Sequence, residues 1–527
     1  MRMGEHMEIV QNRALILRTY NPAKITECIP SSKVVDEIAT PKGTGYRVAV
    51  KWSLPNAKIL QNLGFKKVPS PIEGKYTWPG MFTPFAHQKI TSGFLTLHQR
   101  AYCLNDMGTG KTMSVIWAAD YLMTIGYVRR VLIICPLSIM DSAWRADLFK
   151  TVMHRRVDIA HGTKDKRVKV IQSEAEFVII NYDGVESVRE ELANGGFDLI
   201  VCDEASALKT ATTKRWKMIN SLVKPESWLW LMTGTPAAQS PMDAYGLAKL
   251  LNPASVPSFA GAFRDRVMLK QGPFKYIPKA EAQQIVYEVL QPAVRFTKEE
   301  CLDLPDMTYT ERDVPLTPQQ RKYYDLLRKE LLIHTAGEEV TALNAAIQMN
   351  KLLQISSGAC YADTGEVVEF DCSHRLSEMT DVIRQSSHKT LVFANFKHAI
   401  TTIQAHLTKE GITSEAIHGG VSARKRTEIF DSFQKKPDIQ VLVIQPQAAS
   451  HGVTLHAANT IVWFGPITST ETYLQANARV YRAGQKNPCT VVHLVGSDVE
   501  RKLYKALASR TLAQDTLLAM YKEMFGV

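Results

Sequence analysis

The fold of this chain is most constrained by residues 106–112, which have the sequence Asp-Met-Gly-Thr-Gly-Lys-Thr. This segment joins an apolar run at residues 101–104 to a helix-like pattern at residues 113–121. A glycine-rich turn between a strand and a helix can aim successive backbone N–H groups at phosphate oxygens, in front of the helix N-terminus. The segment therefore predicts a strand–turn–helix unit that binds phosphate. A tight turn with a solvated lysine is the alternative.

The side chains of this segment also fit a bound nucleotide. Lys111 would reach the β- and γ-phosphates, and the hydroxyl of Thr112 would hold Mg²⁺. The strict eight-residue phosphate-loop pattern asks for glycine where this chain has Asn105, so the match is incomplete. The residues expected to contact the nucleotide here are Gly108, Thr109, Gly110, Lys111 and Thr112.

A second strand-like run, residues 197–202, ends in two adjacent carboxylates, Asp203 and Glu204. A continuous apolar run is typical of a buried parallel strand, whose carboxyl end faces the ligand crevice. Asp203 could there orient the water of Mg²⁺, and Glu204 could polarise the water that attacks the γ-phosphate. Two solvated acids that cap the next helix are the alternative, which the upstream Gly-Lys-Thr disfavours. The sequence thus predicts a nucleotide hydrolase with Thr112 and Asp203 as metal ligands.

The composition narrows the class of protein further. With 527 residues, of which 45% are hydrophobic, the chain is long enough for several domains with their own cores. Its net charge of +11 favours a polyanionic partner. Eight scattered cysteines without a Cys-x-x-Cys pair suit a reducing compartment. The sequence carries neither a signal-peptide pattern nor an apolar run of roughly 20 residues, so we expect an intracellular protein without a membrane span.

Apolar strand-like runs alternate with helical patterns in two long blocks of the chain. Such alternation predicts an α/β fold with mostly parallel sheets and helices on both faces. The runs of the first block are residues 131–135, 177–180, 199–202 and 229–232, and those of the second are 390–394, 416–418, 441–444, 460–464 and 490–494. Between the blocks, helical periodicity is strongest at residues 319–332 and 343–353.

The first 75 residues differ from both blocks. Strand-like runs at residues 14–19 and 46–52 are each followed by a possible helix, and the Pro- and Gly-rich residues 69–79 predict a linker. We therefore divide the chain into a small β/α module (1–75), a first lobe (76–257), a helical insertion with the interlobe connection (258–375), a second lobe (376–500) and a C-terminal helix (501–527).

Many short motifs follow one another between residues 80 and 500. They stand at residues 83–88, 135–144, 181–183, 203–206, 233–236, 295–305, 316–320, 353–356, 391–394, 417–420, 450–455 and 475–485. In this order they resemble the Swi/Snf-type ATP-dependent DNA translocases of helicase superfamily 2. The resemblance implies two RecA-like lobes, ATP and Mg²⁺ as cofactors, and Gln88 on the adenine edge. Ser206 stands where that family has histidine, so the coupling role of the histidine stays open.

The best single match is Gln-Ala-Asn-Ala-Arg-Val-Tyr-Arg-Ala-Gly-Gln at residues 475–485, from which only Ala478 and Tyr481 depart clearly. Arg479 and Arg482 are three residues apart, which would place them on one face of a helix. Because the site lies between the lobes, the second lobe must bring positive charge to the γ-phosphate, and either arginine could act as an arginine finger. An exposed basic face is the alternative. The residues expected in catalysis are Lys111, Asp203, Glu204, Gln475, Arg479 and Arg482.

The resemblance also implies a nucleic-acid track across both lobes. Contacts from backbone turns and hydroxyls to phosphates would position the track without reading its sequence, although a turn cap is the alternative for each hydroxyl alone. The residues expected to contact nucleic acid are Ser138, Trp144, Tyr182, Thr233, Gly234, Thr235, Gly419, Gly452 and Thr454.

The element Arg-x-x-Lys-x-x-x-x-x-Leu-Pro at residues 295–305 resembles duplex translocases. We therefore expect a monomeric ATP-dependent translocase on double-stranded DNA that remodels branched DNA or protein–DNA complexes. A strand-separating DNA or RNA helicase is the alternative. Residues 1–75 resemble the HARP-type domain of annealing helicases, with a generic small β/α fold as the alternative. The compact domain organisation is typical of a bacterial or phage protein, so we expect it in the cytoplasm of a bacterium or of a phage-infected cell.

Overall fold

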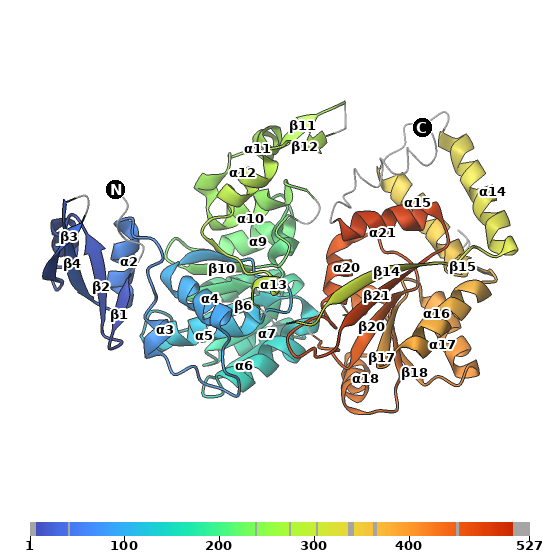
Figure 1. Ribbon diagram of the computed structural model, residues 1–527, viewed down its shortest axis with the longest axis horizontal. Helices are drawn as coiled ribbons and strands as arrows, with labels where there is room; N and C mark the ends of the chain where they lie inside the picture. Colours follow the sequence, from blue (N-terminus) through green and yellow to red (C-terminus); the bar gives the residue numbers. More distant parts are fainter. Residues whose placement is uncertain are drawn as a thin grey trace.

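The computed structural model describes residues 7–40, 43–237, 240–272, 276–301, 304–335, 342–361, 366–449 and 453–509. A small N-terminal sheet and two larger sheets follow one another along the longest axis of the molecule (Figure 1). Within these ranges no helix combines the length and the apolar character that crossing a bilayer requires.

The N-terminal module is an antiparallel sheet covered by a helix. The strand order is β1-β2-β4-β3, with β1 (Glu8–Val10), β2 (Ala14–Thr19), β3 (Lys33–Thr40) and β4 (Gly43–Lys51). Helices α1 (Ala23–Cys28) and α2 (Leu54–Asn62) follow β2 and β4, as the sequence predicts. Alternate residues of β2, Leu15 and Leu17, are buried in a core that contains Trp52 and continues into the next sheet.

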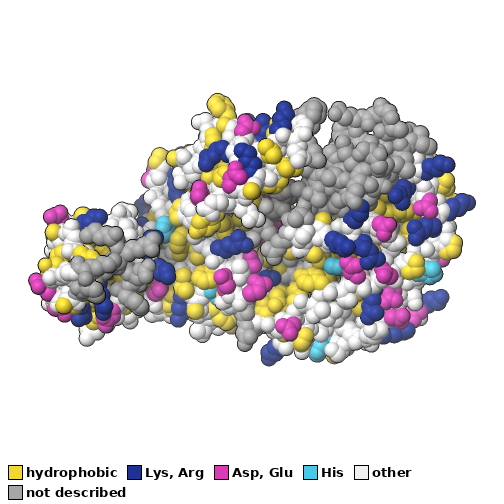
Figure 2. Space-filling model, turned by 45° about the horizontal axis from the view of Figure 1, so that its top comes forward, with side chains coloured by type: hydrophobic (Ala, Val, Ile, Leu, Met, Phe, Trp, Pro, Cys, Tyr) yellow, Lys and Arg dark blue, Asp and Glu magenta, His cyan; other side chains and the backbone are white. Residues whose placement is uncertain are grey.

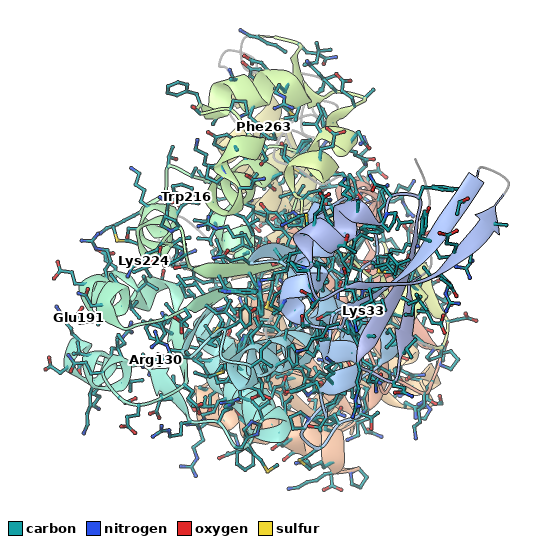
Figure 3. The ribbon with its side chains drawn as sticks, turned by 90° about the vertical axis from the view of Figure 1, so that its left-hand side faces the viewer. Lys33, Arg130, Glu191, Trp216, Lys224 and Phe263 are labelled. Carbon is teal, nitrogen blue, oxygen red and sulfur yellow. The ribbon has the colours of Figure 1, made fainter. Side chains whose placement is uncertain are left out.

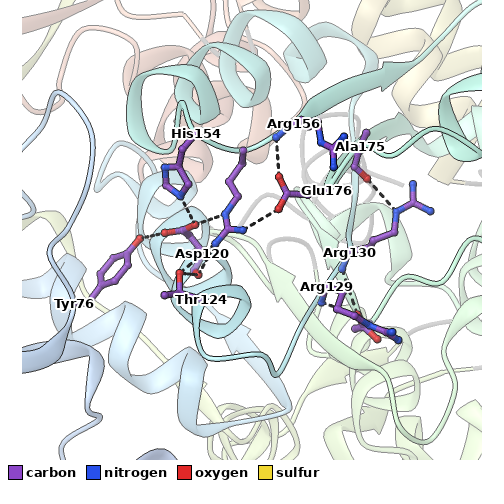
Figure 4. Close-up of polar contacts among 11 residues, drawn as sticks. Tyr76, Asp120, Thr124, Arg129, Arg130, His154, Arg156, Ala175 and Glu176 are labelled. Carbon is purple, nitrogen blue, oxygen red and sulfur yellow. Dashed lines mark hydrogen bonds and ion pairs between the residues drawn. The ribbon is translucent and has the colours of Figure 1, made fainter.

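Residues 69–79, which the sequence predicts to be a linker, are packed against the body of the first lobe. The buried carboxylate of Asp120 accepts a hydrogen bond from the hydroxyl of Tyr76, and its other oxygen lies 3.0 Å from His154 Nε2 and 2.6 Å from Arg155 Nε (Figure 4). A buried carboxylate needs such partners because burial without them is costly. The connection is therefore fixed at Tyr76.

Lobe 1 is built on a parallel sheet with the strand order β13-β5-β10-β9-β6-β8-β7. The strands are β5 (Arg100–Cys103), β6 (Val131–Cys135), β7 (Val157–Ala160), β8 (Phe177–Asn181), β9 (Leu199–Cys202), β10 (Trp228–Met232) and β13 (Ala293–Val294). The helices are α3 (Ile72–Lys75), α4 (Ala86–Leu97), α5 (Lys111–Thr124), α6 (Ala146–Thr151), α7 (Lys164–Ile171), α8 (Arg189–Asn194), α9 (Lys214–Leu222) and α10 (Asp243–Leu251). Every residue of β6, β8, β9 and β10 is buried, because helices cover both faces.

Lobe 2 is built on a second parallel sheet with the order β14-β21-β20-β17-β19-β18. The strands are β14 (Met307–Asp313), β17 (Lys389–Phe393), β18 (Ser414–Ile417), β19 (Val441–Ile444), β20 (Ala458–Trp463) and β21 (Cys489–Val495). The helices are α16 (Ser373–Gln385), α17 (Lys397–Lys409), α18 (Ala423–Lys435), α19 (Pro446–Ala449), α20 (Thr470–Asn477) and α21 (Asp498–Ala508). The predicted α/β class with two parallel sheets is confirmed.

The region between the lobes contains more than the predicted helices. Its elements are α11 (Ala260–Val267), β11 (Met268–Lys270), β12 (Tyr276–Pro278), α12 (Ala282–Val289), α13 (Lys298–Cys301), α14 (Pro318–Thr335), α15 (Ala342–Ser356), β15 (Ala359–Tyr361) and β16 (Val367–Glu369). β13 pairs with β5 and β14 pairs with β21, so the chain crosses between the two sheets after Val294 and before Met307. The five-part division of the chain stays a prediction.

The helical part attached to lobe 1 lies away from the N-terminal sheet. Figure 3 shows Trp216 of α9 and Phe263 of α11 on one side of the molecule and Lys33 of β3 on the other. Phe263 is fully buried, and the indole of Trp216 donates to the Gly246 carbonyl at 2.8 Å. These anchors attach α9 to α10 and α11 to the core of lobe 1.

We expect acid to destabilise lobe 2 through His493. This side chain is buried, stacked on Tyr504 and hydrogen-bonded to the Tyr473 hydroxyl at 2.9 Å, and burial lowers its pKa to about 4. The unfolded chain takes up the proton near pH 6.5, so this stabilisation is complete above that pH and is lost as the pH falls toward 4. The loss is about 3 kcal/mol. In thermal unfolding between pH 7.5 and 5, His493→Gln should flatten the fall of Tm, whereas exposed His388→Gln should not.

Candidate nucleotide and nucleic-acid site

The phosphate loop, residues 106–112, connects β5 to α5 as the sequence predicts. Gly108 and Gly110 have φ angles of +87° and +77°, in the left-handed region that favours glycine. The Thr109 hydroxyl donates to the Asp106 carbonyl at 2.8 Å and closes the turn. A Cβ at Gly108 would lie 3.1 Å from the Cβ of Arg482, so lobe 2 touches the loop at this glycine.

Asn105, the departure from the strict pattern, braces the loop. Its side chain is buried, donates to Thr91 Oγ1 at 2.8 Å and accepts from the Phe296 N–H at 3.0 Å. Glycine could make neither contact. Asn105 therefore ties the loop to α4 and to the chain after β13. The phosphate-loop pattern does not reveal this role, because both partners lie outside that pattern.

Lys111 and Gln88 both contact the backbone of the loop region. Lys111 Nζ donates to the carbonyls of Asn105 at 2.9 Å and Asp106 at 3.2 Å, which holds the ammonium over the loop. Gln88 is buried; its carbonyl oxygen accepts from the Phe85 N–H at 2.9 Å and its amide donates to the Gly110 carbonyl at 3.4 Å. Gln88 thus lies beside the loop, and its contact with the adenine edge stays a prediction.

Asp203 and Glu204 follow β9, two strands away from β5 in the sheet. Asp203 is buried, and its Oδ2 accepts from Trp144 Nε1 at 2.8 Å. The hydroxyl of Tyr182 donates to the Asp203 carbonyl at 2.8 Å. Glu204 has a φ angle of +49°, which a non-glycine residue seldom adopts and which marks a constrained turn.

Burial controls the protonation of these two acids. Desolvation raises the pKa of Asp203, while Lys111 and the Trp144 N–H oppose the rise. Desolvation, followed by the neighbouring Asp203 charge, raises the pKa of Glu204 to about 7. Glu204 Oε2 is buried without a hydrogen-bond partner among the described residues. An acid whose pKa lies near neutrality and whose oxygen is free suits a general base.

The two arginines of lobe 2 do not lie on a helix, and that prediction is wrong. α20 ends at Asn477, and the backbone N–H groups of Arg479 and Val480 bond three residues back in a turn. The side chain of Gln485 fixes this turn, because its amide donates to the Ala458 carbonyl at 2.9 Å and to the Val480 carbonyl at 3.3 Å. The residues 478–485 are called the arginine turn below.

The arginine turn faces the predicted catalytic groups. Arg479 interacts electrostatically with Glu204, and burial together with Arg482 lowers the pKa of Arg479 to about 10. Arg482 donates to the Val453 carbonyl at 3.1 Å and faces Asp147 of lobe 1. The structure therefore brings both arginines to the edge of lobe 1 that carries the phosphate loop and Glu204.

Lys298, which lies within a predicted motif but was given no role of its own, joins the lobes beside this site. Its ammonium donates to the Tyr481 carbonyl at 3.1 Å, and its backbone N–H donates to Asp106 Oδ2 at 3.4 Å. Burial lowers the pKa of Lys298 to about 8. Lys298 lines an interlobe cavity of about 280 Å³ that also includes Thr235 and Asn477.

The residues predicted to contact nucleic acid differ in their exposure to solvent. Ser138 and Gly419 are exposed, and Gly234, Thr235 and Thr454 are half-buried. Trp144, Tyr182 and Thr233 are buried, and the first two hold Asp203. The expectation of a nucleic-acid contact at Trp144 needs correction for this conformation, because its side chain has no exposed surface. Gly452 lies outside the described residues.

The parallel sheets, the phosphate loop and the facing arginine turn define the class of two-lobed nucleotide hydrolases of helicase superfamily 2. The family model of the SNF2-related domain matches residues 95–360, which is half of the chain. A second model, the helicase conserved C-terminal domain, matches residues 374–484. The chain belongs to the SNF2-related family, which confirms the predicted Swi/Snf-type relationship and implies ATP as the nucleotide.

Several relatives share this region at low identity. A chromodomain-helicase-DNA-binding protein 1-like protein of Danio rerio is 24% identical over 79% of this chain and 41% of its own length. A SWI/SNF-related matrix-associated actin-dependent regulator of chromatin subfamily A-like protein 1 homolog of Caenorhabditis elegans is 28% identical over 91% of this chain and 68% of its own. Protein p41 of Acyrthosiphon pisum secondary endosymbiont phage 1 is 24% identical over 84% and 99%. The chain thus spans about two fifths of the first relative.

Proposed function

We propose that this protein is an ATP-dependent translocase on double-stranded DNA. ATP would be hydrolysed between the lobes, and the resulting lobe movement would remodel branched DNA or protein–DNA complexes. The observation that carries the proposal is the contact of the arginine turn with the phosphate loop, where Arg482 meets Gly108 and Arg479 faces Glu204. Positive charge from lobe 2 is thereby available where negative charge develops in phosphoryl transfer.

Each predicted catalytic residue has a role in this proposal. Lys111 would bind the β- and γ-phosphates, Glu204 would take the proton of the attacking water, and the arginines would stabilise the developing charge. Gln475 would contact the same site from α20. Mg²⁺, bound by Thr112 and Asp203, would neutralise phosphate charge. The Thr112 hydroxyl and the buried Asp203 carboxylate are oxygen ligands of the kind that Mg²⁺ prefers. Oε2 of the neighbouring Glu204 has no hydrogen-bond partner among the described residues.

Charge and family membership support DNA as the track. The chain carries a net charge of +11, and the face drawn in Figure 2 shows Lys and Arg side chains interspersed with acidic ones over both lobes. A positive net charge suits contacts to phosphates that do not read sequence. The names of two relatives include DNA-binding or chromatin functions, which agrees with this track. Residues 1–75 would direct the motor to branched DNA, and the phage relative agrees with a bacterial or phage setting.

Triplex displacement tests the proposal directly. On a blunt duplex that carries a triplex-forming third strand, we expect ATP-dependent release of that strand, because a translocating motor pushes it off. A forked duplex should show little processive unwinding. Duplex DNA should stimulate phosphate release more than single-stranded DNA or RNA, and binding should weaken steeply as salt rises because phosphate contacts release counterions.

The Lys111→Ala variant is the control for release without ATP hydrolysis. Stimulation of ATP hydrolysis that is greatest with RNA, together with no triplex displacement, would contradict the proposal and favour a strand-separating helicase.

Deletion of residues 1–75 would be unsuitable as a test of the N-terminal module, since its core is continuous with lobe 1. Arg18→Glu on the exposed side of β2 tests instead whether the module favours branched DNA.

A further inference from the structure

Ser206 makes a contact between the lobes that its sequence motif does not predict. It lies in the short helical turn Ala205–Leu208, two residues after Glu204. Its hydroxyl donates to Glu471 Oε1 at 2.9 Å, and Glu471 belongs to the first turn of α20 in lobe 2. Both side chains are half-buried, so the bond is partly shielded from water.

The same carboxylate oxygen also holds Gln475. The Gln475 amide donates to Glu471 Oε1 at 3.3 Å, one turn further along α20. Ser206 and Gln475 therefore share one bridging acceptor. Glu471 supplies that acceptor, and one oxygen connects the acidic motif of lobe 1 to the predicted catalytic glutamine of lobe 2.

The negative charge of Glu471 strengthens its contacts with Ser206 and Gln475. A carboxylate makes a stronger hydrogen bond to a hydroxyl than a neutral amide oxygen does. Glu471 also lies in the first turn of α20, where a negative side chain is favourable.

We propose that Glu471 is a positioning residue that couples lobe closure to ATP hydrolysis, and that the Ser206–Glu471–Gln475 bridge replaces the histidine-based coupling of related motors in this chain. In the structure the Ser206–Glu471 bond joins the lobes while the arginine turn lies against the phosphate loop. It therefore biases the lobes toward the closed arrangement and holds Gln475 at the site. Because Glu471 acts on hydrolysis between the lobes, this role rests on the proposed ATPase function.

A double-mutant cycle on duplex-stimulated phosphate release tests the bridge. Glu471→Ala and Ser206→Ala should each lower kcat by about 10-fold or more, as expected for loss of a hydrogen bond to a charged group, while KM for ATP changes little. The double variant should be no slower than the slower single variant, because both remove one bridge. Glu471→Gln, which keeps an acceptor oxygen, should recover most of the kcat.

An interlobe distance measurement separates positioning from a structural defect. With dyes at the exposed residues 166 in lobe 1 and 435 in lobe 2, a non-hydrolysable ATP analogue should raise the closed fraction in the wild type and less so in Glu471→Ala. Glu428→Ala, on the exposed face of α18, is the matched acidic control and should behave as the wild type. If Glu471→Ala lowers Tm, the same measurements are made on Ser206→Ala and Glu471→Gln instead.

Additive losses in the cycle, or wild-type kcat and closure in Glu471→Ala, would overturn the role of Glu471. Those outcomes leave the ATPase assignment intact, provided that the wild type hydrolyses ATP with duplex DNA and Lys111→Ala does not. A wild type without DNA-stimulated hydrolysis would instead contradict the proposed function itself. The two failures are therefore distinguishable.

Discussion

Lys111→Ala is expected to lower duplex-stimulated ATP hydrolysis by at least about a hundredfold, since loss of one donor aimed at transition-state charge costs about 10²- to 10³-fold in other enzymes. In the structure the Lys111 ammonium is held over the loop by the carbonyls of Asn105 and Asp106. A phosphate anion would compete with these neutral acceptors because an ionic partner makes the stronger bond. Phosphate release under saturating DNA measures the effect.

Two companion variants sharpen this result. Lys166→Ala, an exposed lysine of α7, should hydrolyse ATP at the wild-type rate and excludes a general charge effect. Glu204→Gln should bind ATP and DNA but hydrolyse slowly, because the amide cannot take the proton of water. Near-normal turnover in Lys111→Ala or in Glu204→Gln would remove the basis for the nucleotide site at these strand ends.

Buried parallel strands were the most predictable elements of the fold. β6, β9 and β19 begin and end where their apolar runs do, because each is covered on both faces and every residue is buried. β7 and β14 were not predicted. β14, with the sequence Met-Thr-Tyr-Thr-Glu-Arg-Asp, lies at the edge of its sheet with most residues exposed, so tertiary pairing with β21 rather than local pattern makes it a strand.

The positions of the loop and of the acidic pair were predictable because their spacing is local. The arginine turn was not, because the side chain of Gln485 fixes it through the carbonyl of Ala458 in β20, after α20 has ended at Asn477. Trp144 likewise reaches Asp203 across 59 residues of sequence. No motif predicts the contacts that Asn105 and Glu471 make. Contacts between distant segments thus decide the parts of the site that the sequence alone leaves open.

Substitutions in the arginine turn are expected to cause the second large loss of ATP hydrolysis. Arg482→Ala and Arg479→Ala are each expected to lower kcat by about 10³-fold or more, the range found where an arginine finger is removed from other nucleotide hydrolases. Arg479 interacts electrostatically with Glu204, and Arg482 packs against Gly108 of the phosphate loop, so both arginines lie close to the predicted nucleotide site. Steady-state ATPase assays with saturating duplex DNA give kcat and KM for each variant.

The division of the loss between kcat and KM decides what the arginines do. Charge that develops only in the transition state interacts with them after ATP is bound, so kcat should fall far more than ATP affinity. Arg424→Ala on the exposed face of α18 controls for loss of a lobe 2 arginine and should keep both constants. Variants of Arg479 and Arg482 that kept kcat and raised only KM would show ground-state binding instead. In that case lobe 2 would close on bound ATP without completing the catalytic site, and hydrolysis would depend on lobe 1 alone.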